Sequence, residues 1–228
     1  MKHSLVFAML LAACGSKSSN VQSGTKVPAA VGSVSDFDGT AYPIMQIGTQ
    51  RWTGKNLAVT HYDNGDPIPL VQDASAWAAL TTGAYAVYEN KSENQTTYGL
   101  LYNWYAVTDP RGIAPKGWTV PAASDWVTLS TGLGGDNDSG GKLKDATAWT
   151  QSTDATNASG FTALPGGYRD RDGVFTGILA NEDWWSTSDD QTPGGDGSFV
   201  AIAYFNGTFD EGHNRKTMGL AVRCLQNP

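Results

Sequence analysis

The sequence is poor in cysteine, histidine and charge. Its 228 residues include two cysteines and three histidines, and charged residues make up only 16% of the chain. Aromatic residues, by contrast, reach 11%, and glycine occurs 27 times. A disordered acidic tail and a coiled coil are both rich in charge, so this composition excludes them. It indicates a globular domain with many loops.

Positive charge is scarcer than negative charge. The chain has 15 lysines and arginines against 22 aspartates and glutamates, which gives a net charge of −7. Proteins that bind a nucleic acid backbone neutralise its phosphates with clustered lysines and arginines. We therefore expect no nucleic acid partner.

Motifs of catalysis and metal binding are lacking as well. There is no Gly-x-Ser-x-Gly elbow, and neither His61 nor His213 has a recognisable nucleophile or the spacing of a zinc site. Residues 135–143 partly match a phosphate-binding loop, but Leu143 replaces the Ser or Thr, and two carboxylates lie where phosphate would bind. We expect no enzymatic activity. A hydrolase that uses two paired carboxylates is the alternative.

The N-terminal apolar run, residues 5–11, is too short to span a bilayer as a helix but suits the core of a signal peptide. It ends in Leu-Ala-Ala-Cys14, which resembles the lipobox of bacterial lipoproteins, where the cysteine is acylated and becomes the mature N-terminus. The resemblance implies a signal peptide over 1–13 and a membrane anchor at Cys14. Gly15 stands where an inner-membrane retention signal has Asp, which favours the outer membrane. An ordinary signal peptide with a coincidental cysteine is the alternative.

A tether and a domain follow the predicted anchor. Residues 14–40 are rich in small residues without periodicity and predict a flexible tether, with the globular domain over 41–228. If Cys14 carries lipid, Cys224 has no partner for an intramolecular disulfide. Since Cys224 lies in an apolar segment, we expect it to be buried and reduced.

Local patterns predict an α+β domain with short helices and β-hairpins. Residues 42–52 read as a hairpin with its turn at 48–49, and residues 121–130 read as a helix that Gly132 ends. A further hairpin should join 199–204 to 220–225 through the turn Asn206-Gly207.

Several ordered segments together resemble one known family. They are Ile47 to Trp52 with Lys55 to Leu57, Tyr98 to Trp104, Pro115 to Pro121 with Asp125-Trp126, Gly141 to Lys144, Asn157 to Phe161, Leu164 to Arg169, Trp185 to Ser188, and Gly219 to Cys224. Over about residues 42–226 the chain resembles the Fibrobacter succinogenes major paralogous domain, which is common in lipoproteins. Thr53-Gly54 and Leu220-Ala221 depart from the family's usual residues. The resemblance implies a C-type-lectin-like architecture, without implying an activity.

Aromatic residues inside polar loops are the best candidates for a binding surface. The candidate ligand-binding residues are Trp184, Asp189, Asp190, Tyr204, Asn206, Asp210, His213 and Asn214. Neighbouring strand residues point to opposite faces, so we expect Trp184 to be exposed and Trp185 to be buried. Indole faces pack against the C–H faces of sugar rings while Asp or Asn binds hydroxyls, so polysaccharide is the expected class of ligand.

Calcium is a weaker possibility at Asp136 and Asp138, which cluster hard oxygen ligands in one turn. Position 12 of an EF-hand counted from Asp136 is Thr147, so the bidentate glutamate is missing. The sequence as a whole favours a non-catalytic recognition or adhesion module of the cell envelope. A structural envelope component, or a receptor diversified by a retroelement near its C-terminus, are the alternatives.

Overall fold

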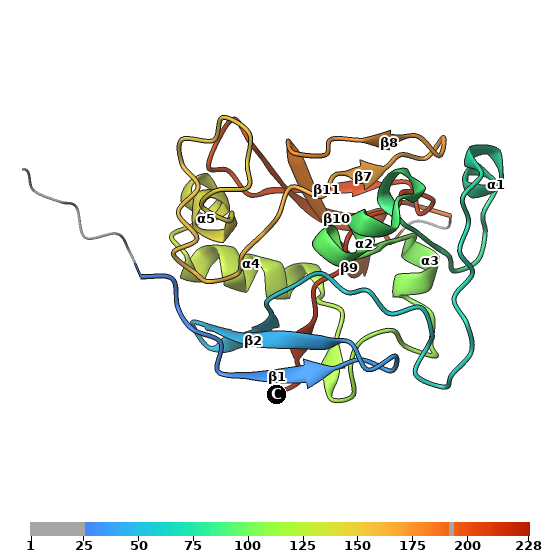
Figure 1. Ribbon diagram of the computed structural model, residues 1–228, viewed down its shortest axis with the longest axis horizontal. Helices are drawn as coiled ribbons and strands as arrows, with labels where there is room; N and C mark the ends of the chain where they lie inside the picture. The colour runs from blue at the N-terminus through green and yellow to red at the C-terminus, as the bar shows by residue number, and fades with distance from the viewer. Residues whose placement is uncertain (1–25, 192–193) are drawn as a thin grey trace, which may run out of the picture.

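Among the residues that the computed structural model describes, 26–191 and 194–228, antiparallel strands combine with short helices (Figure 1). The predicted α+β class is confirmed. The largest sheet has the order β1-β2-β3-β12-β6, with bounds Gly32–Ser35, Ala41–Ile47, Gln50–Thr53, Leu225–Gln226 and Trp118–Thr119. A second sheet has the order β11-β10-β9, with bounds Asp210–Asn214, Gly197–Ala203 and Asn181–Asp189. Two small sheets pair β4 (Tyr85–Ala86) with β5 (Leu101–Tyr102) and β7 (Tyr168–Arg169) with β8 (Phe175–Thr176).

All the helices lie after β3 and before β7 in the described chain. Their bounds are α1 Ala74–Ala78, the 3-10 helix η1 Tyr88–Asn90, α2 Ser92–Tyr98, α3 Trp104–Val107, α4 Ala123–Gly132 and α5 Asp136–Leu143. The helix predicted over 121–130 is confirmed as α4. The Asp125 carboxylate accepts a hydrogen bond from the Ala122 N–H, and Trp126 and Leu129 bury one face. The hairpin predicted over 42–52 is confirmed as β2–β3.

Helix α5 was not predicted, because its sequence is rich in glycine and aspartate. Two of its glycines are there for close approach. A Cβ on Gly140 would lie 2.3 Å from the carbonyl oxygen of Thr208, and one on Gly141 would lie 2.7 Å from that of Asp154. Because glycine has no Cβ, this helix can pack directly on the backbone of the 204–209 turn.

The C-terminal segment pairs differently from the prediction. Strand β10 does pair across the turn after it, but with the polar strand β11 and not with residues 220–225. The segment 219–227 instead exchanges backbone hydrogen bonds with distant parts of the chain. Its partners are Thr53, Leu57, Tyr102, Gly117, Arg169, Asp183 and Trp185. Residues 219–227 thus connect the sheets and bring widely separated segments to one core.

Strand β9 is covered on both faces, which makes the prediction for Trp184 wrong. Trp185 lies in one hydrophobic cluster and Trp184 in another, and both side chains are fully buried. Trp184 stacks on Trp126 with ring centroids 5.7 Å apart. Its Nε1 donates a hydrogen bond to Asn56 Oδ1 at 3.0 Å. The two side chains do point to opposite faces of β9, but each face packs against a hydrophobic cluster, so both side chains are buried.

The ordered fold begins earlier than the predicted boundary at residue 41. Strand β1 pairs antiparallel with β2 through residues 32–35, so part of the predicted tether belongs to the sheet. The predicted signal peptide and Cys14 lie outside the described residues. Within those residues, no helix is long and apolar enough to cross a membrane.

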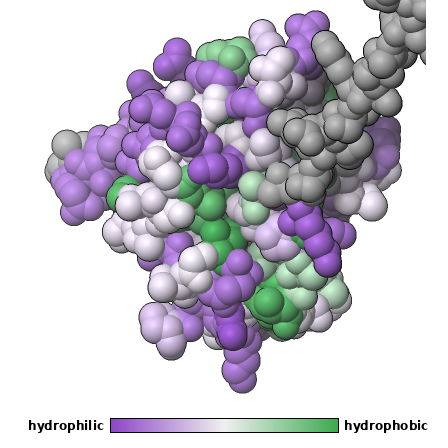
Figure 2. All heavy atoms as spheres, turned by 90° about the vertical axis from the view of Figure 1, so that its left-hand side faces the viewer, coloured by the Kyte–Doolittle hydropathy of each residue, from purple (hydrophilic) through white to green (hydrophobic). Residues whose placement is uncertain are grey.

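One side of the molecule carries α4 and α5, and the described chain leaves toward its N-terminus there (Figure 1). Figure 2 shows this side with small hydrophobic areas set between hydrophilic residues. Where grey atoms do not cover it, this side therefore presents patches of mixed polarity.

Candidate ligand-binding sites

The predicted surface divides between the two ends of the β10–β11 hairpin. At one end, Gly197 pairs with both Asp189 and Asn214, and His213 is the next residue. At the other end, Ala201 pairs with Asp210. The four residue steps from Gly197 to Ala201 span about 13 Å at the rise of a strand. The predicted residues therefore do not form a single site.

At the first end, the acidic side chains already have partners within the protein. Asp189 lies 3.5 Å from Lys216 Nζ, and this lysine sits 4.3 Å from the centroid of the Trp104 ring. The Asp190 carboxylate accepts a hydrogen bond from the Asp196 N–H at 3.1 Å. These contacts fix the ends of the strands.

At the second end, two neighbouring aromatic side chains project from the turn after β10. We call Tyr204 and Phe205 the aromatic tip. Phe205 is 69% exposed and Tyr204 is 37% exposed, and their rings meet edge to face with centroids 5.4 Å apart. Asn206 lies on this turn and Asp210 begins β11, and the Thr208 hydroxyl lies within hydrogen-bond distance of both side chains. Tyr204, Asn206 and Asp210 are thus brought together, and Phe205 was missed by the sequence analysis.

A buried lysine holds the aromatic tip from beneath. Lys144 is fully buried, and its Nζ donates hydrogen bonds to the carbonyl oxygen of Asn206 at 2.5 Å and to both carboxylate oxygens of Asp154 at 3.2 Å. Burial lowers the pKa of Lys144, although Asp154 works against this shift. Partial burial would raise the pKa of Asp154, but hydrogen bonds from Ser152 and Lys144 outweigh it and the net pKa is lowered. The backbone of the aromatic tip is therefore held by Lys144, whose charge is paired with the Asp154 carboxylate.

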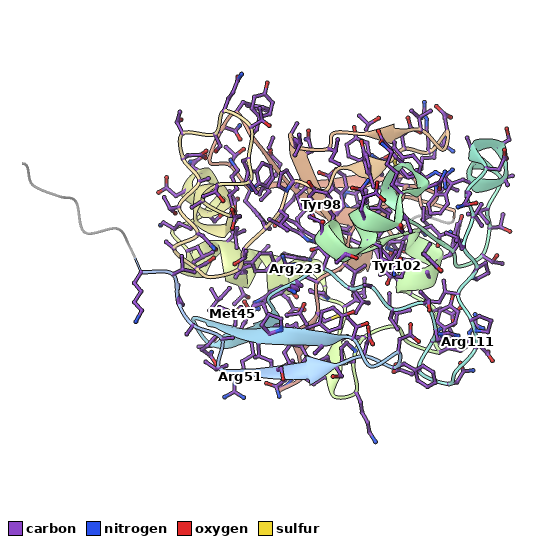
Figure 3. All side chains as sticks on the ribbon, in the orientation of Figure 1. Met45, Arg51, Tyr98, Tyr102, Arg111 and Arg223 are labelled. Carbon is purple, nitrogen blue, oxygen red and sulfur yellow. The ribbon has the colours of Figure 1, made fainter. Side chains whose placement is uncertain are left out.

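A cavity of about 800 Å³ lies between β2, the loop over 54–58, α2 and the segment over 27–30. We call it the α2 cavity. Its walls include Val27, Pro43 and Met45. Figure 3 shows Tyr98, Arg223 and Met45 following one another from α2 toward β2. This size lies within the range of pockets that enclose small ligands.

Arg223 and Asn56 form the polar floor of the α2 cavity. Arg223 is 1% exposed, and its Nε donates a hydrogen bond to Asn56 Oδ1 at 2.7 Å. Its other donors bind three backbone carbonyl oxygens, those of Thr53, Phe161 and Thr162. The guanidinium also lies 4.3 Å from the Phe161 ring centroid.

Strand β9 carries two neighbouring buried carboxyls, of which Glu182 contacts this floor and Asp183 lies on the other face of the strand. Glu182 accepts hydrogen bonds from Asn56 Nδ2 at 2.6 Å and from the Gly166 N–H at 2.6 Å. Burial raises the pKa of Glu182 and lowers that of Arg223, while attraction between the two groups opposes both shifts. Burial alone raises the pKa of Asp183 to about 7. The Oδ1 atom of Asp183 is buried without a hydrogen-bond partner.

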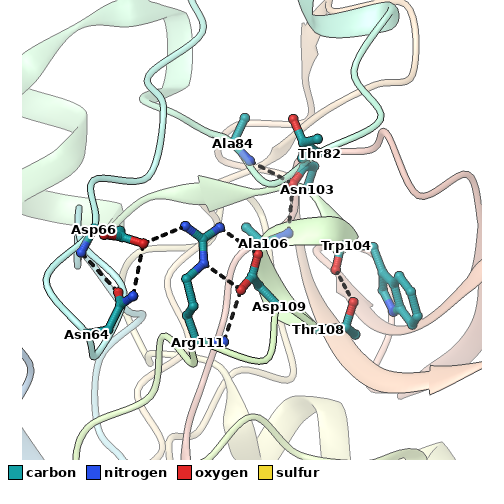
Figure 4. A network of polar contacts seen from close by, with 10 residues as sticks. All are labelled: Asn64, Asp66, Thr82, Ala84, Asn103, Trp104, Ala106, Thr108, Asp109 and Arg111. Carbon is teal, nitrogen blue, oxygen red and sulfur yellow. Dashed lines mark hydrogen bonds and ion pairs between the residues drawn. The ribbon is translucent and has the colours of Figure 1, made fainter.

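A different arginine, Arg111, lies in an exposed ion-pair network (Figure 4). Its guanidinium binds Asp66 at 3.0 Å and Asp109 at 2.8 Å, and lies 3.8 Å from the centroid of the Tyr62 ring. The hydrogen bonds that Arg111 donates to both carboxylates raise the pKa of its guanidinium. The network joins two loops and leaves Arg111 neutralised.

The remaining predicted residues are placed as follows. Asp136 and Asp138 lie in the first turn of α5, and Asp136 Oδ1 accepts a hydrogen bond from Ser130 Oγ at 2.5 Å. In the described part of the chain, no group of three or more His, Cys, Asp or Glu is placed to hold a metal ion. Cys224 is buried as predicted, and burial raises the pKa of its thiol.

Charged residues inside apolar segments of the sequence are a signal for the polar network at the α2 cavity. Arg223 stands in the otherwise apolar segment 220–225, and Glu182-Asp183 immediately precede two buried tryptophans. Charged residues in apolar segments are buried only when they are hydrogen-bonded, so they mark polar networks inside the core. Which segments of the chain supply the hydrogen-bond partners of these buried charges depends on the tertiary structure.

Comparison with known proteins identifies a family that matches most of the chain. The model of the Fibrobacter succinogenes major domain matches residues 45–226, which is most of the chain. No curated protein and no solved structure matches the sequence. The match begins within β2 and extends to β12, and so includes the aromatic tip and most of the residues that line the α2 cavity. The chain belongs to the Fibrobacter succinogenes major domain family.

Proposed function

We propose that this chain is a lipid-anchored recognition or adhesion module of the outer membrane, which binds polysaccharide through the aromatic tip without catalysis. The observation that carries this proposal is the 69% exposure of Phe205 on a turn that Lys144 fixes from beneath. Tyr204 and Phe205 are adjacent exposed rings that meet edge to face, and a contiguous exposed apolar patch rimmed by polar groups is typical of an interaction site. Asn206 on this turn and Asp210 at the start of β11 supply polar groups that can bind hydroxyls.

The charge around the aromatic tip favours a neutral ligand. Asp210 and Glu211 follow the tip in the chain and both are exposed. Carboxylates accept hydrogen bonds from sugar hydroxyls but repel an anionic surface. One stacked ring contributes about 1 kcal/mol, so a single tip would bind only at about millimolar concentration. Many anchored copies on one cell would supply avidity.

Two matched substitutions test the binding surface. Phe205→Ala should lower binding of the full chain, immobilised at high density, to insoluble cellulose, xylan or mannan by about fivefold, because one stacking contact is lost. Phe37→Ala removes another exposed phenylalanine, 53% exposed, far along the chain from the tip and should leave binding unchanged. Neither variant should change the melting temperature. Equal binding by the two variants, or no binding of any of the polysaccharides by the native chain, would contradict the proposal.

Anchoring is tested separately at Cys14. Cys14→Ser removes the thiol that would carry the lipid, so the variant should move from the detergent phase to the aqueous phase when a detergent solution is separated by warming. Cys224→Ser is the matched control and should stay in the detergent phase. A Cys14→Ser variant that still enters the detergent phase would overturn the lipoprotein assignment.

A hydrolase remains the second candidate, because Glu182 and Asp183 are carboxyls with raised pKa values. Such shifts are frequent at catalytic sites. Both oxygens of Glu182 are already hydrogen-bonded inside the protein, however, and neighbouring residues on a strand face opposite sides. The two groups therefore do not flank a common substrate position, which favours binding without catalysis.

We also propose the C-type-lectin-like architecture that the family resemblance implies. The feature that supports it is the antiparallel pairing of the C-terminal strand β12 with β3, beside the N-terminal strands β1 and β2. A second sheet, β9–β11, carries the loops of the opposite half. An experimental structure that can be superposed on a lectin-like domain would test this assignment.

A further inference from the structure

The α2 cavity has a charge unlike that of the rest of the protein. The chain carries a net charge of −7, with 22 acidic residues. Of the 21 described residues that line this cavity, two are cationic, Lys55 and Arg223, and none is Asp or Glu. The cavity is therefore a local region of positive charge on an acidic protein.

The charge of Arg223 is not cancelled by an ion pair within the described chain. Its acceptors are one amide oxygen and three backbone carbonyl oxygens, all of them neutral. The nearest acid in this network, Glu182, is separated from Arg223 by the side chain of Asn56. Arginine stays protonated in proteins, so the positive charge persists at the floor. Arg111 and Lys144, in contrast, each contact a carboxylate directly.

One donor of Arg223 is left over. A guanidinium has five N–H donors, and four are accounted for by Asn56, Thr53, Phe161 and Thr162. Arg223 is among the residues that line the cavity, and its side chain is 1% exposed in the protein alone. Lys55 is exposed at the cavity and makes a second cation available to an anionic group.

The walls of the cavity suit an apolar body. Val27, Pro28, Pro43, Met45 and Leu164 contribute side chains to the lining. The threonines of α2, such as Thr97, line another part and are exposed to solvent. Apolar walls with few polar groups are typical of sites that bind small molecules, and the polar groups set the orientation of the ligand.

We propose that the α2 cavity binds an anionic amphiphile, namely an alkyl carboxylate whose chain packs against the apolar walls and whose carboxylate faces Arg223 and Lys55. This site is distinct from the aromatic tip. Its charge complementarity and its volume are independent of whether the tip binds polysaccharide. A neutral alkyl chain or an extended peptide would use the walls but would leave the positive charge without a partner.

The first arm of the test uses dodecanoate below its micelle concentration and dodecanol below its solubility limit. The full chain carries Cys14→Ser so that it needs no detergent, which would compete for the cavity. Isothermal titration calorimetry should show dodecanoate binding at least about tenfold more tightly than dodecanol, because a charge-assisted hydrogen bond is lost in the alcohol. Equal affinities, or no heat from either compound, would overturn the proposal.

The second arm locates the site with two exposed helical threonines in the same setting. Thr97 in α2 and Thr128 in α4 each donate a hydroxyl hydrogen bond to the carbonyl oxygen four residues earlier. Thr97→Trp should fill the cavity and lower the affinity for dodecanoate by at least about tenfold, while Thr128→Trp should leave it unchanged. Equal affinities in these two variants would place the ligand elsewhere and overturn the proposal.

The third arm isolates the charge. Lys55→Gln should weaken dodecanoate about three- to fivefold, the effect of one exposed charge, and should leave dodecanol unaffected. Lys116→Gln makes the same change at another exposed lysine outside the cavity and should have no effect. Phe205→Ala should also leave dodecanoate binding intact, so failure of the polysaccharide proposal is separable from failure of this one. An equal loss in Lys55→Gln and Lys116→Gln would contradict the assigned carboxylate position.

Discussion

Lys144 and Arg223 are both buried cations that donate hydrogen bonds to backbone carbonyl oxygens, but their surroundings differ. Lys144 contacts the carboxylate of Asp154 at 3.2 Å and supports the aromatic tip. Arg223 binds neutral oxygens and forms the floor of the α2 cavity. At the tip the charge is neutralised and the aromatic groups face outward. At the cavity the charge is retained and apolar groups enclose a space.

This difference shows that one structural device can serve two roles. A buried cation gathers carbonyl oxygens that would otherwise lack partners, and so fixes irregular backbone. Whether the same cation also acts on a ligand depends on its counter-ion. Lys144 has one and is confined to support, whereas Arg223 leaves an electric field in a region of low dielectric constant.

The largest effect is expected from Arg223→Met. The substitution keeps much of the volume but removes the N–H groups that donate to the carbonyl oxygens of Thr53, Phe161 and Thr162, so it should lower the free energy of unfolding by about 4 kcal/mol. Urea denaturation followed by tryptophan fluorescence measures the change. Arg51→Met, at an exposed arginine of β3, is the control and should cost less than about 1 kcal/mol. Similar losses in both variants would mean that the buried network contributes little.

The next effect depends on pH and concerns Asp183, the buried neighbour of Glu182 on β9. Its pKa is raised from 3.8 to about 7, so the folded protein binds this proton more tightly than the unfolded chain does. The associated stability is present in full below pH 4 and is lost as the pH rises through 7, by about 1.4 kcal/mol per pH unit. Asp183→Asn cannot ionise and should gain about 3 kcal/mol relative to the native protein between pH 5 and pH 8. Denaturation curves at both pH values measure this, and parallel pH profiles would contradict it.

A smaller effect is expected from Lys144→Met, because its partner Asp154 is partly exposed and can be hydrated. The variant should lose about 2 kcal/mol through the unpaired carbonyl oxygen of Asn206 and the lost ion pair. It should also weaken polysaccharide binding, since the aromatic tip is no longer held, while dodecanoate binding stays unchanged. Thermal melting and the two binding assays report these effects. A loss of dodecanoate binding would show that the two regions are coupled.

Local features of the fold could be predicted from the sequence, because they depend on neighbouring residues. The hairpin β2–β3 follows from its turn and α4 from the polar residues near its start and the helical spacing of Trp126 and Leu129, and both are confirmed. Burial of Cys224 follows from its apolar setting, and burial of Trp185 was expected from alternation along a strand. These predictions needed no knowledge of distant contacts.

Predictions that depend on distant contacts failed. Trp184 is buried because a second core, around Trp126, covers the other face of β9, and alternation along one strand contains no information about that core. Strand β10 pairs with the polar strand β11 and not with residues 220–225. Residues 220–225 pair instead with segments far along the chain. The candidate ligand-binding residues fall into two groups for the same reason. They are close in sequence, but the pairing of β10 with β11 places them at opposite ends of the hairpin.

The position of residues 219–227 has a consequence for how the protein is made. These residues supply backbone partners to segments from Thr53 to Trp185, so the core cannot close until residues 219–227 have left the ribosome. Pairings this distant in sequence are slow to form. The preceding segments would therefore stay loosely organised until this segment joins them. A chain cut before residue 219, by a premature stop or a protease, would leave several sheets without their shared partner.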